Sequence, residues 1–162
     1  MIISSLPITL GADYEVDPIE NFPVFTGRIN LEVSFQRFIG VSNTVTFDAI
    51  ADAIVNALVT NVTIKTYCNT NFAKYHSVHQ WATQAYSADR DDYPAFTVLA
   101  SGKSRDEDAE EWTYSLVVEV AMVDSTATTT TVSGVKKVVY DGPAKLELLL
   151  GYAWDAISAI AT

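Results

Sequence analysis

The stretch TFDAIADAIVNALVTN at residues 46–61 and the stretch WTYSLVVEVAMV at residues 112–123 decide the fold class of this chain. In the first, apolar residues recur every three or four positions, which predicts a helix with one buried face. Thr46 is a suitable N-cap, and Asp48 lies in the first turn, where the helix dipole favours a negative charge. In the second, large apolar residues alternate with smaller or polar ones, which predicts a strand. Together the two stretches indicate an α+β fold.

The remaining chain extends this prediction. Residues 143–160 predict a second helix, because Gly142-Pro143 opens a broad stripe of leucines, alanines and isoleucines. Apolar runs predict further strands at residues 62–67, 93–100 and 136–140. The order helix, four strands, helix indicates a largely antiparallel four-stranded sheet with the two helices packed on one face.

The first 42 residues are expected to form an N-terminal extension to an α+β domain at residues 43–162. Within the extension, Ile29, Leu31, Val33 and Phe35 alternate with polar residues, which predicts a strand. Prolines punctuate the rest. We expect this extension to contact a neighbouring subunit or a partner ring rather than to join the central sheet.

Charge and cysteine content restrict the partners. The chain has 20 acidic and 10 basic residues, for a net charge of -10, which disfavours tight binding to phosphate backbones. No apolar run approaches the roughly 20 residues that span a bilayer, so no membrane partner is expected. Cys68 is the one cysteine; it cannot form an internal disulfide, and a reducing compartment is expected.

Residues that carry catalysis or bind metals are scarce. His76 and His79 form an H-x-x-H pair, but a zinc site needs three or four ligands and Cys68 is the only other soft candidate. We expect the histidines to be ordinary polar residues of a long loop and Cys68 to be a packing residue. Neither a dinucleotide-binding glycine motif nor a P-loop is present. We therefore expect no catalytic residue, no metal and no cofactor, and a structural or assembly protein rather than an enzyme.

Two regions are candidates for contact surfaces. The connection at residues 69–92 is rich in aromatic residues that either pack over the sheet or anchor an interface. Trp81 and Tyr86 of this connection, with Trp154, are our candidates for subunit contacts. The second region is an acidic turn, which is either a solvated loop or a functional surface facing a DNA channel or a basic partner. Its residues are Asp106, Glu107, Asp108, Glu110 and Glu111.

A family resemblance lies in the order of these segments. The helix at residues 47–61 leads into a strand, and a Tyr-Pro-x-x-x-Val strand follows as Tyr93-Pro94-Ala95-Phe96-Thr97-Val98. An acidic loop, a long strand and a final amphipathic helix complete the order. Over about residues 44–162 the chain resembles the tail-terminator and tail-completion proteins of the neck of long-tailed bacteriophages.

The resemblance implies a structural virion protein that is assembled in the host cytoplasm. Such proteins form a homo-oligomeric ring, commonly of six subunits, that caps the tail tube and joins it to the head connector. The expected partners are therefore other copies of this chain, the tail tube protein and the connector proteins, and DNA passes through the lumen without specific binding. The alternative is a small ligand-binding or enzymatic α+β domain whose pocket uses loop 69–92, with His79, Trp81 and Tyr86.

Overall fold

A computed structural model describes residues 2–5, 15–16, 23–36, 45–81, 92–106 and 111–161 of the chain. It is an α+β fold, as the sequence predicts. Its elements, in chain order, are β1 Ile2–Ser5, β2 Glu15–Val16, β3 Pro23–Gln36, α1 Phe47–Thr60, α2 Val62–Phe72, β4 Ser77–Gln80, β5 Ala95–Asp106, β6 Glu111–Val123, β7 Ala127–Val132, β8 Val135–Tyr140, α3 Gly142–Ser158 and a terminal 3-10 turn, Ala159–Ala161.

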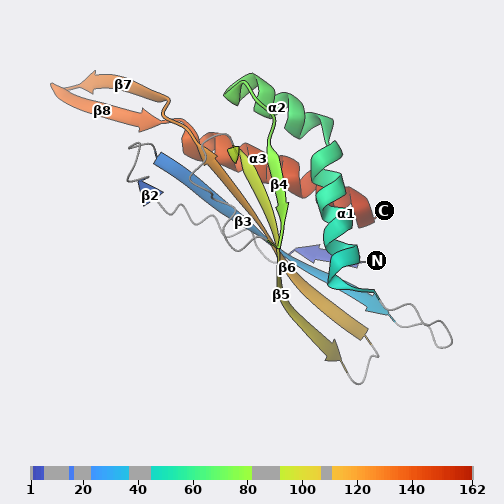
Figure 1. Cartoon of the computed structure of the whole chain (residues 1–162). Coiled ribbons are helices and arrows are strands. Elements are labelled where there is room, and N and C mark those ends of the chain that lie inside the picture. Colours follow the sequence, from blue (N-terminus) through green and yellow to red (C-terminus); the bar gives the residue numbers. More distant parts are fainter. Residues whose placement is uncertain are drawn as a thin grey trace.

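The central sheet is mostly antiparallel. Its strand order is β1-β3-β6-β5-β4, and β2 pairs with the start of β3 (Figure 1). The pairs β1–β3, β3–β6 and β5–β6 are antiparallel, whereas the short edge strand β4 runs parallel to β5. The three longest strands, β3, β6 and β5, therefore form the centre of the sheet.

The helices cover one face of this sheet. In β3 and β6 the paired residues Ile29 and Val118 point to that face, as do Leu31 and Leu116, and all four are buried. Helix α3 packs against β3 and β6, and α1 packs against β4, β5 and α3. Each buried leucine or isoleucine contributes roughly 1.5–3 kcal/mol to the hydrophobic stabilisation of the fold. The expected packing of the two predicted helices on one face is confirmed.

The predicted strand at residues 62–67 is wrong, because this segment belongs to α2. Asn61 ends α1 and caps α2, since its Oδ1 accepts a hydrogen bond from the amide of Ile64 at 2.9 Å. Ile64 and Cys68 are four residues apart and both are buried, so they form the inner face of a helix.

Among the described residues no single helix is long and apolar enough to cross a bilayer; α1 and α2 qualify only when taken together across their 54° bend.

The expectation that the first 42 residues stay outside the central sheet is also wrong. Strand β3 pairs along its length with β6, from Val24 opposite Val123 to Gln36 opposite Glu111. The alternation of Ile29, Leu31 and Val33 is the reason, because it supplies an apolar row that continues the buried face of β6. The N-terminal segment thus contributes a central strand of the sheet.

Candidate interaction surfaces

Strands β7 and β8 form a separate hairpin that we call the arm, residues 127–140. The sequence predicts the strand at residues 136–140 as part of the central sheet, and it predicts a hairpin tip at residues 125–134. In the structure β8 pairs only with β7, and the turn is reduced to Ser133 and Gly134. Both turn residues have positive φ, 51° and 82°, as a two-residue type I′ turn requires.

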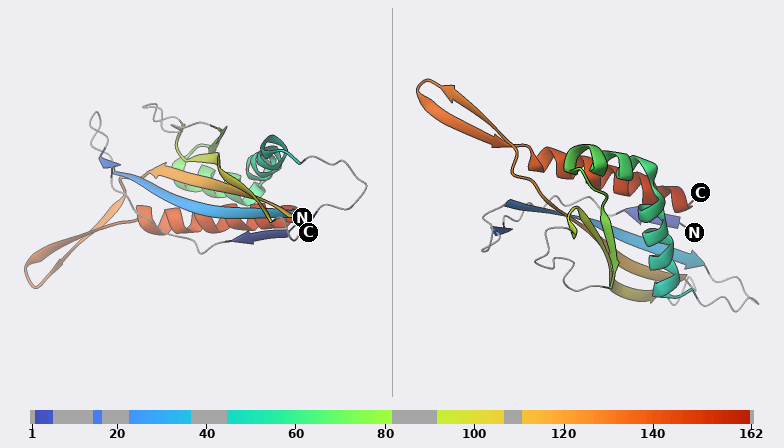
Figure 2. Two further views of the ribbon diagram at one scale, coloured as in Figure 1. Left: turned by 90° about the horizontal axis from the view of Figure 1, so that it is seen from below. Right: turned by 45° about the horizontal axis from the view of Figure 1, so that its top comes forward.

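The arm projects from the body and is exposed on both of its faces. Every residue of β7 and β8 is exposed, and the views in Figure 2 show the hairpin pointing away from the helices and the sheet. An isolated two-stranded hairpin is marginally stable in water. Five of the exposed side chains are nevertheless large and apolar: Val132, Val135, Val138, Val139 and Tyr140. Such a hairpin is well suited to contact another protein.

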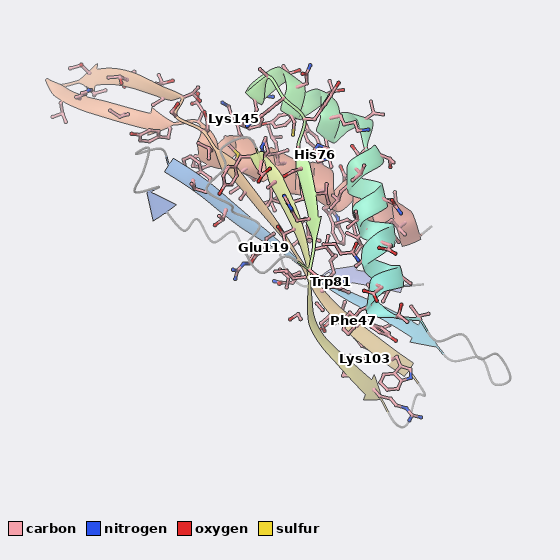
Figure 3. The ribbon with its side chains drawn as sticks, viewed as in Figure 1. Phe47, His76, Trp81, Lys103, Glu119 and Lys145 are labelled. Carbon is pink, nitrogen blue, oxygen red and sulfur yellow. The ribbon has the colours of Figure 1, made fainter. Side chains whose placement is uncertain are left out.

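The base of the arm is fixed by a small polar cluster. The side chain of Asp124 accepts hydrogen bonds from the amide and the hydroxyl of Thr126, at 2.9 and 2.7 Å. The Lys145 ammonium lies 2.8 Å from the Asp124 carboxylate and donates to the Thr126 hydroxyl at 2.9 Å. Asp124 is buried, and Lys145 is largely so; Figure 3 shows Lys145 near the base of the arm. Since Lys145 belongs to α3, these contacts tie the start of β7 to that helix.

Electrostatics keep the Asp124 carboxylate ionised. Burial alone raises its pKa, but the hydrogen bond and the charge of Lys145, together with the hydrogen bonds from Thr126, outweigh burial and lower the pKa below its ordinary value. The arm is therefore anchored by an ion pair that is intact at neutral pH.

A second surface lies at the N-terminal end of α1. The ring of Phe47 packs edge-on against Tyr114 and Trp81, with centroid distances of 5.1 and 6.3 Å, and Figure 3 shows Phe47 beside Trp81. The Trp81 indole donates to Asp48 Oδ1 at 2.9 Å. Along β5, Lys103 places its ammonium 4.2 Å from the centre of the Trp112 ring, a cation–π contact. These aromatic side chains are thus held by their own chain.

The structure separates the aromatic residues that the sequence groups as subunit contacts. Trp81 follows β4 and packs against α1, where it is half-buried. Trp154 belongs to α3 and packs against the core, where it is also half-buried. Tyr86 lies outside the described residues. Sequence reasoning missed the arm as the most exposed apolar element, although the β-branched run at residues 127–132 and 135–139 was a usable signal.

The acidic turn is described only at its two ends. Asp106 is the last residue of β5 and Glu111 the first of β6, and the two are register partners. Glu107, Asp108 and Glu110 lie outside the described residues. The turn therefore joins two of the three longest strands at the end of the sheet that points away from the arm (Figure 1).

The two histidines are engaged separately. His76 Nε2 contacts the Leu58 carbonyl oxygen at 3.0 Å, and burial lowers the pKa of His76. His79 lies in β4, not in a loop, and its Nε2 is 3.0 Å from the Ser77 hydroxyl. That hydroxyl donates to the Asp92 carbonyl, so His79 Nε2 is the donor to it. The described residues hold no group of three or more His, Cys, Asp or Glu side chains placed to bind a metal.

Cys68 is buried inside α2, where it packs in the core as expected. Burial raises the pKa of its thiol to about 12. A thiol with such a pKa is almost entirely protonated at neutral pH, and the thiolate is the reactive form. Cys68 is therefore a poor nucleophile in the folded chain.

A shallow pocket of about 300 Å³ lies where α1 meets the start of β4. Its lining residues are Val59, Lys65, Tyr75, His76 and Val78. His76 Nδ1 is buried there without a hydrogen-bond partner. The pocket differs from the one that the sequence predicts, because neither His79 nor Trp81 lines it.

Comparisons with known proteins add no relative. No protein-family model matches the chain, and neither the curated proteins nor the solved structures contain a significant match.

Proposed function

We propose that this chain is a structural virion protein: a subunit of a homo-oligomeric ring at the neck of a long-tailed bacteriophage. The ring caps the tail tube and joins it to the head connector, and DNA passes through its lumen. The observation that carries the proposal is the arm, whose exposed valines and tyrosine suit a contact between subunits better than contact with water. The resemblance to tail terminators adds the location through the Tyr93-Pro94-x-x-x-Val98 motif, the acidic loop, the long strand β6 and the final helix α3. Its first step, a strand directly after the helix at residues 47–61, does not contribute, because that segment is α2.

The charge of the chain supports the same assignment. A net charge of -10 disfavours adhesion to DNA that must slide through a channel. The acidic turn between β5 and β6, at residues 106–111, is the segment that we assign to the lumen, with a basic partner protein as the other possible neighbour. Neither role requires a catalytic group.

Native mass spectrometry and single-particle electron microscopy test this function directly. The purified chain, measured between about 1 and 100 μM, is expected to give one discrete closed oligomer, and its class averages are expected to show a ring with a central opening. A chain that stays monomeric over this range, alone and with tail tube protein, would rule out the proposed function.

A small-molecule binding domain is the second candidate, and the pocket at His76 favours it. His76 donates to the Leu58 carbonyl through Nε2 and leaves Nδ1, the acceptor nitrogen of the neutral ring, without a partner, so a ligand that donates a hydrogen bond has a place to bind. Imidazole and inorganic phosphate are suitable first probes. A monomeric chain whose His76 and Tyr75 resonances shift saturably with either probe would favour this candidate over the ring.

A further inference from the structure

The exposed large apolar side chains of the described residues fall into two groups. One is the arm. The other group, which we call the α1–α2 corner, consists of Val59 and Tyr75, which line one pocket, and Val62 at the start of α2. These three side chains are 42, 66 and 72% exposed. Outside these two groups only Leu148 on α3 is similarly exposed among the described residues. Two separate apolar patches on one chain are the requirement for head-to-tail association, in which one patch of each copy meets the other patch of the next.

The two faces of the arm differ. Register pairing places Val132, Val135 and Val139 on one face together with Lys137, whereas Val138 and Tyr140 lie on the other face with Lys136. The first face thus carries Val132 and Val135 at the tip and Val139 towards the base, with Lys137 between them. We call it the valine face.

The arm of a copy points away from that copy's own corner. It projects on the side of the molecule opposite α1 in Figure 1 and in the right-hand view of Figure 2. The ion pair between Asp124 and Lys145 fixes its base on α3. A partner for the valine face must therefore come from a different molecule.

Charge favours a second copy of this chain as that molecule. Residues 125–140 contain two of the ten basic residues and none of the twenty acidic ones, so this segment carries +2 and the rest of the chain carries -12. The exposed side chain of Asp52 lies two helical turns before Val59 on the same side of α1, which places a negative charge about 10 Å along the helix from the corner. Lys65, which lines the pocket at the corner, opposes this attraction locally.

The lengths of the two elements also agree. Six residues of β8 span about 20 Å at ~3.4 Å per residue. The 14 residues of α1 span about 21 Å at ~1.5 Å per residue. A hairpin laid along α1 would place its valines at the corner while a lysine of the arm reaches the acidic side of the helix.

We propose that the valine face of the arm of one copy docks on the α1–α2 corner of a second copy, head to tail. This inference rests on the proposed ring and names the surfaces that close it. Because the contact is heterologous, it generates a ring when the rotation between neighbours closes and a filament when it does not.

Two single substitutions and their mixture test the inference. Val139→Asp places a charge on the valine face, and Val62→Asp places one on the corner at the first position of α2, where a negative charge is compatible with the helix. Each variant alone is expected to be a monomer by light scattering, with wild-type circular dichroism. Mixed 1:1, they are expected to form a heterodimer and nothing larger, because the intact arm of one variant meets the intact corner of the other.

The matched control is Val138→Asp, on the opposite face of the arm and equally exposed, at 43% against 46% for Val139. It is expected to assemble as the wild type does. The inference is overturned if Val139→Asp still assembles, if Val138→Asp disrupts assembly as strongly, or if the mixture stays monomeric. If the wild type is nevertheless an oligomer, only the docking of the arm on the corner is rejected and the proposed ring function is kept. If the wild type is a monomer, both proposals are rejected.

Discussion

The ammonium group of Lys145 lies 2.8 Å from the carboxylate of Asp124, and this ion pair links α3 to the segment that enters the arm. Its Asp124 side chain is 5% exposed and its Lys145 side chain 18%. A second ion pair in the sheet, Arg28 with Glu119, has a similar length of 2.7 Å, but its arginine is 66% exposed. Because the two ion pairs have nearly the same length, a comparison of their variants shows how burial changes the contribution of an ion pair to stability.

Replacing Lys145 with Met is expected to lower the free energy of unfolding by about 3–5 kcal/mol, because it leaves the buried Asp124 charge without its partner. The matched change Arg28→Met is expected to cost no more than about 1 kcal/mol, since that pair is exposed to solvent. Urea denaturation of the two variants measures both. Equal losses would mean that the buried pair does not anchor the arm.

The Asp124 carboxylate should also give stability a specific pH dependence. Its pKa in the folded chain lies below the ordinary value of about 3.9. The carboxylate therefore contributes its full stabilisation above about pH 4, and loses it as the pH falls through the folded-state pKa. We expect Asp124→Asn to be less stable than wild type at pH 7, and the difference to shrink below pH 4. A difference that is constant from pH 7 to pH 3 would contradict this assignment.

Gly142 begins α3 directly against Phe25, and a Cβ at this position would overlap the Phe25 ring. Gly142→Ala is therefore expected to destabilise the fold by about 1–3 kcal/mol, the usual cost of overpacking a core. Gly151 lies in the same helix with open space around it. Gly151→Ala is expected to stabilise the fold by up to about 1 kcal/mol through helix propensity. Thermal denaturation distinguishes the two, and a stabilising Gly142→Ala would show that the contact is soft.

Cys68 is expected to resist thiol reagents until the chain unfolds, because its thiol is buried and its pKa is raised to about 12. The control is Leu148→Cys, which places a second thiol on α3 at a site that is 48% exposed and lies outside both proposed docking surfaces. With Ellman's reagent at pH 8, we expect no fast-reacting thiol in the wild type and one fast-reacting thiol in the variant. Rapid reaction of Cys68 in native wild type would indicate that α2 opens readily.

Periodicity predicted the elements that bury one clear face. Helix α1 and strand β6 were correct because each has a single apolar row that meets the core. The error at residues 62–67 has a local cause. Val62, Thr63 and Ile64 are β-branched and favour a strand, but the Asn61 cap and the burial of Ile64 and Cys68 outweigh that preference. The helical conformation of this segment therefore depends on tertiary packing, and tertiary packing cannot be read from the local sequence.

The pairing of β7 with β8 and the position of β3 in the sheet were missed for a different reason. Residues 127–132 have polar threonines that resemble a loop, and only their pairing with 135–140 makes them a strand. Strand β3 was recognised as a strand, yet its partner β6 is distant in sequence. Alternation shows that a strand has an apolar face but not which strand it joins. The candidate interaction surfaces depend on these two pairings, so the sequence alone predicted poorly which side chains they expose.

The distance between β3 and β6 along the chain also has a consequence for synthesis on the ribosome. Ile29 pairs with Val118, which is 89 residues later. At about 5–20 residues per second, the β6 residues emerge some 4–18 s after those of β3. During that time β3 has only β1 and β2 to pair with, and its apolar row lacks β6 beside it, so a nascent-chain chaperone has a long period in which to bind it.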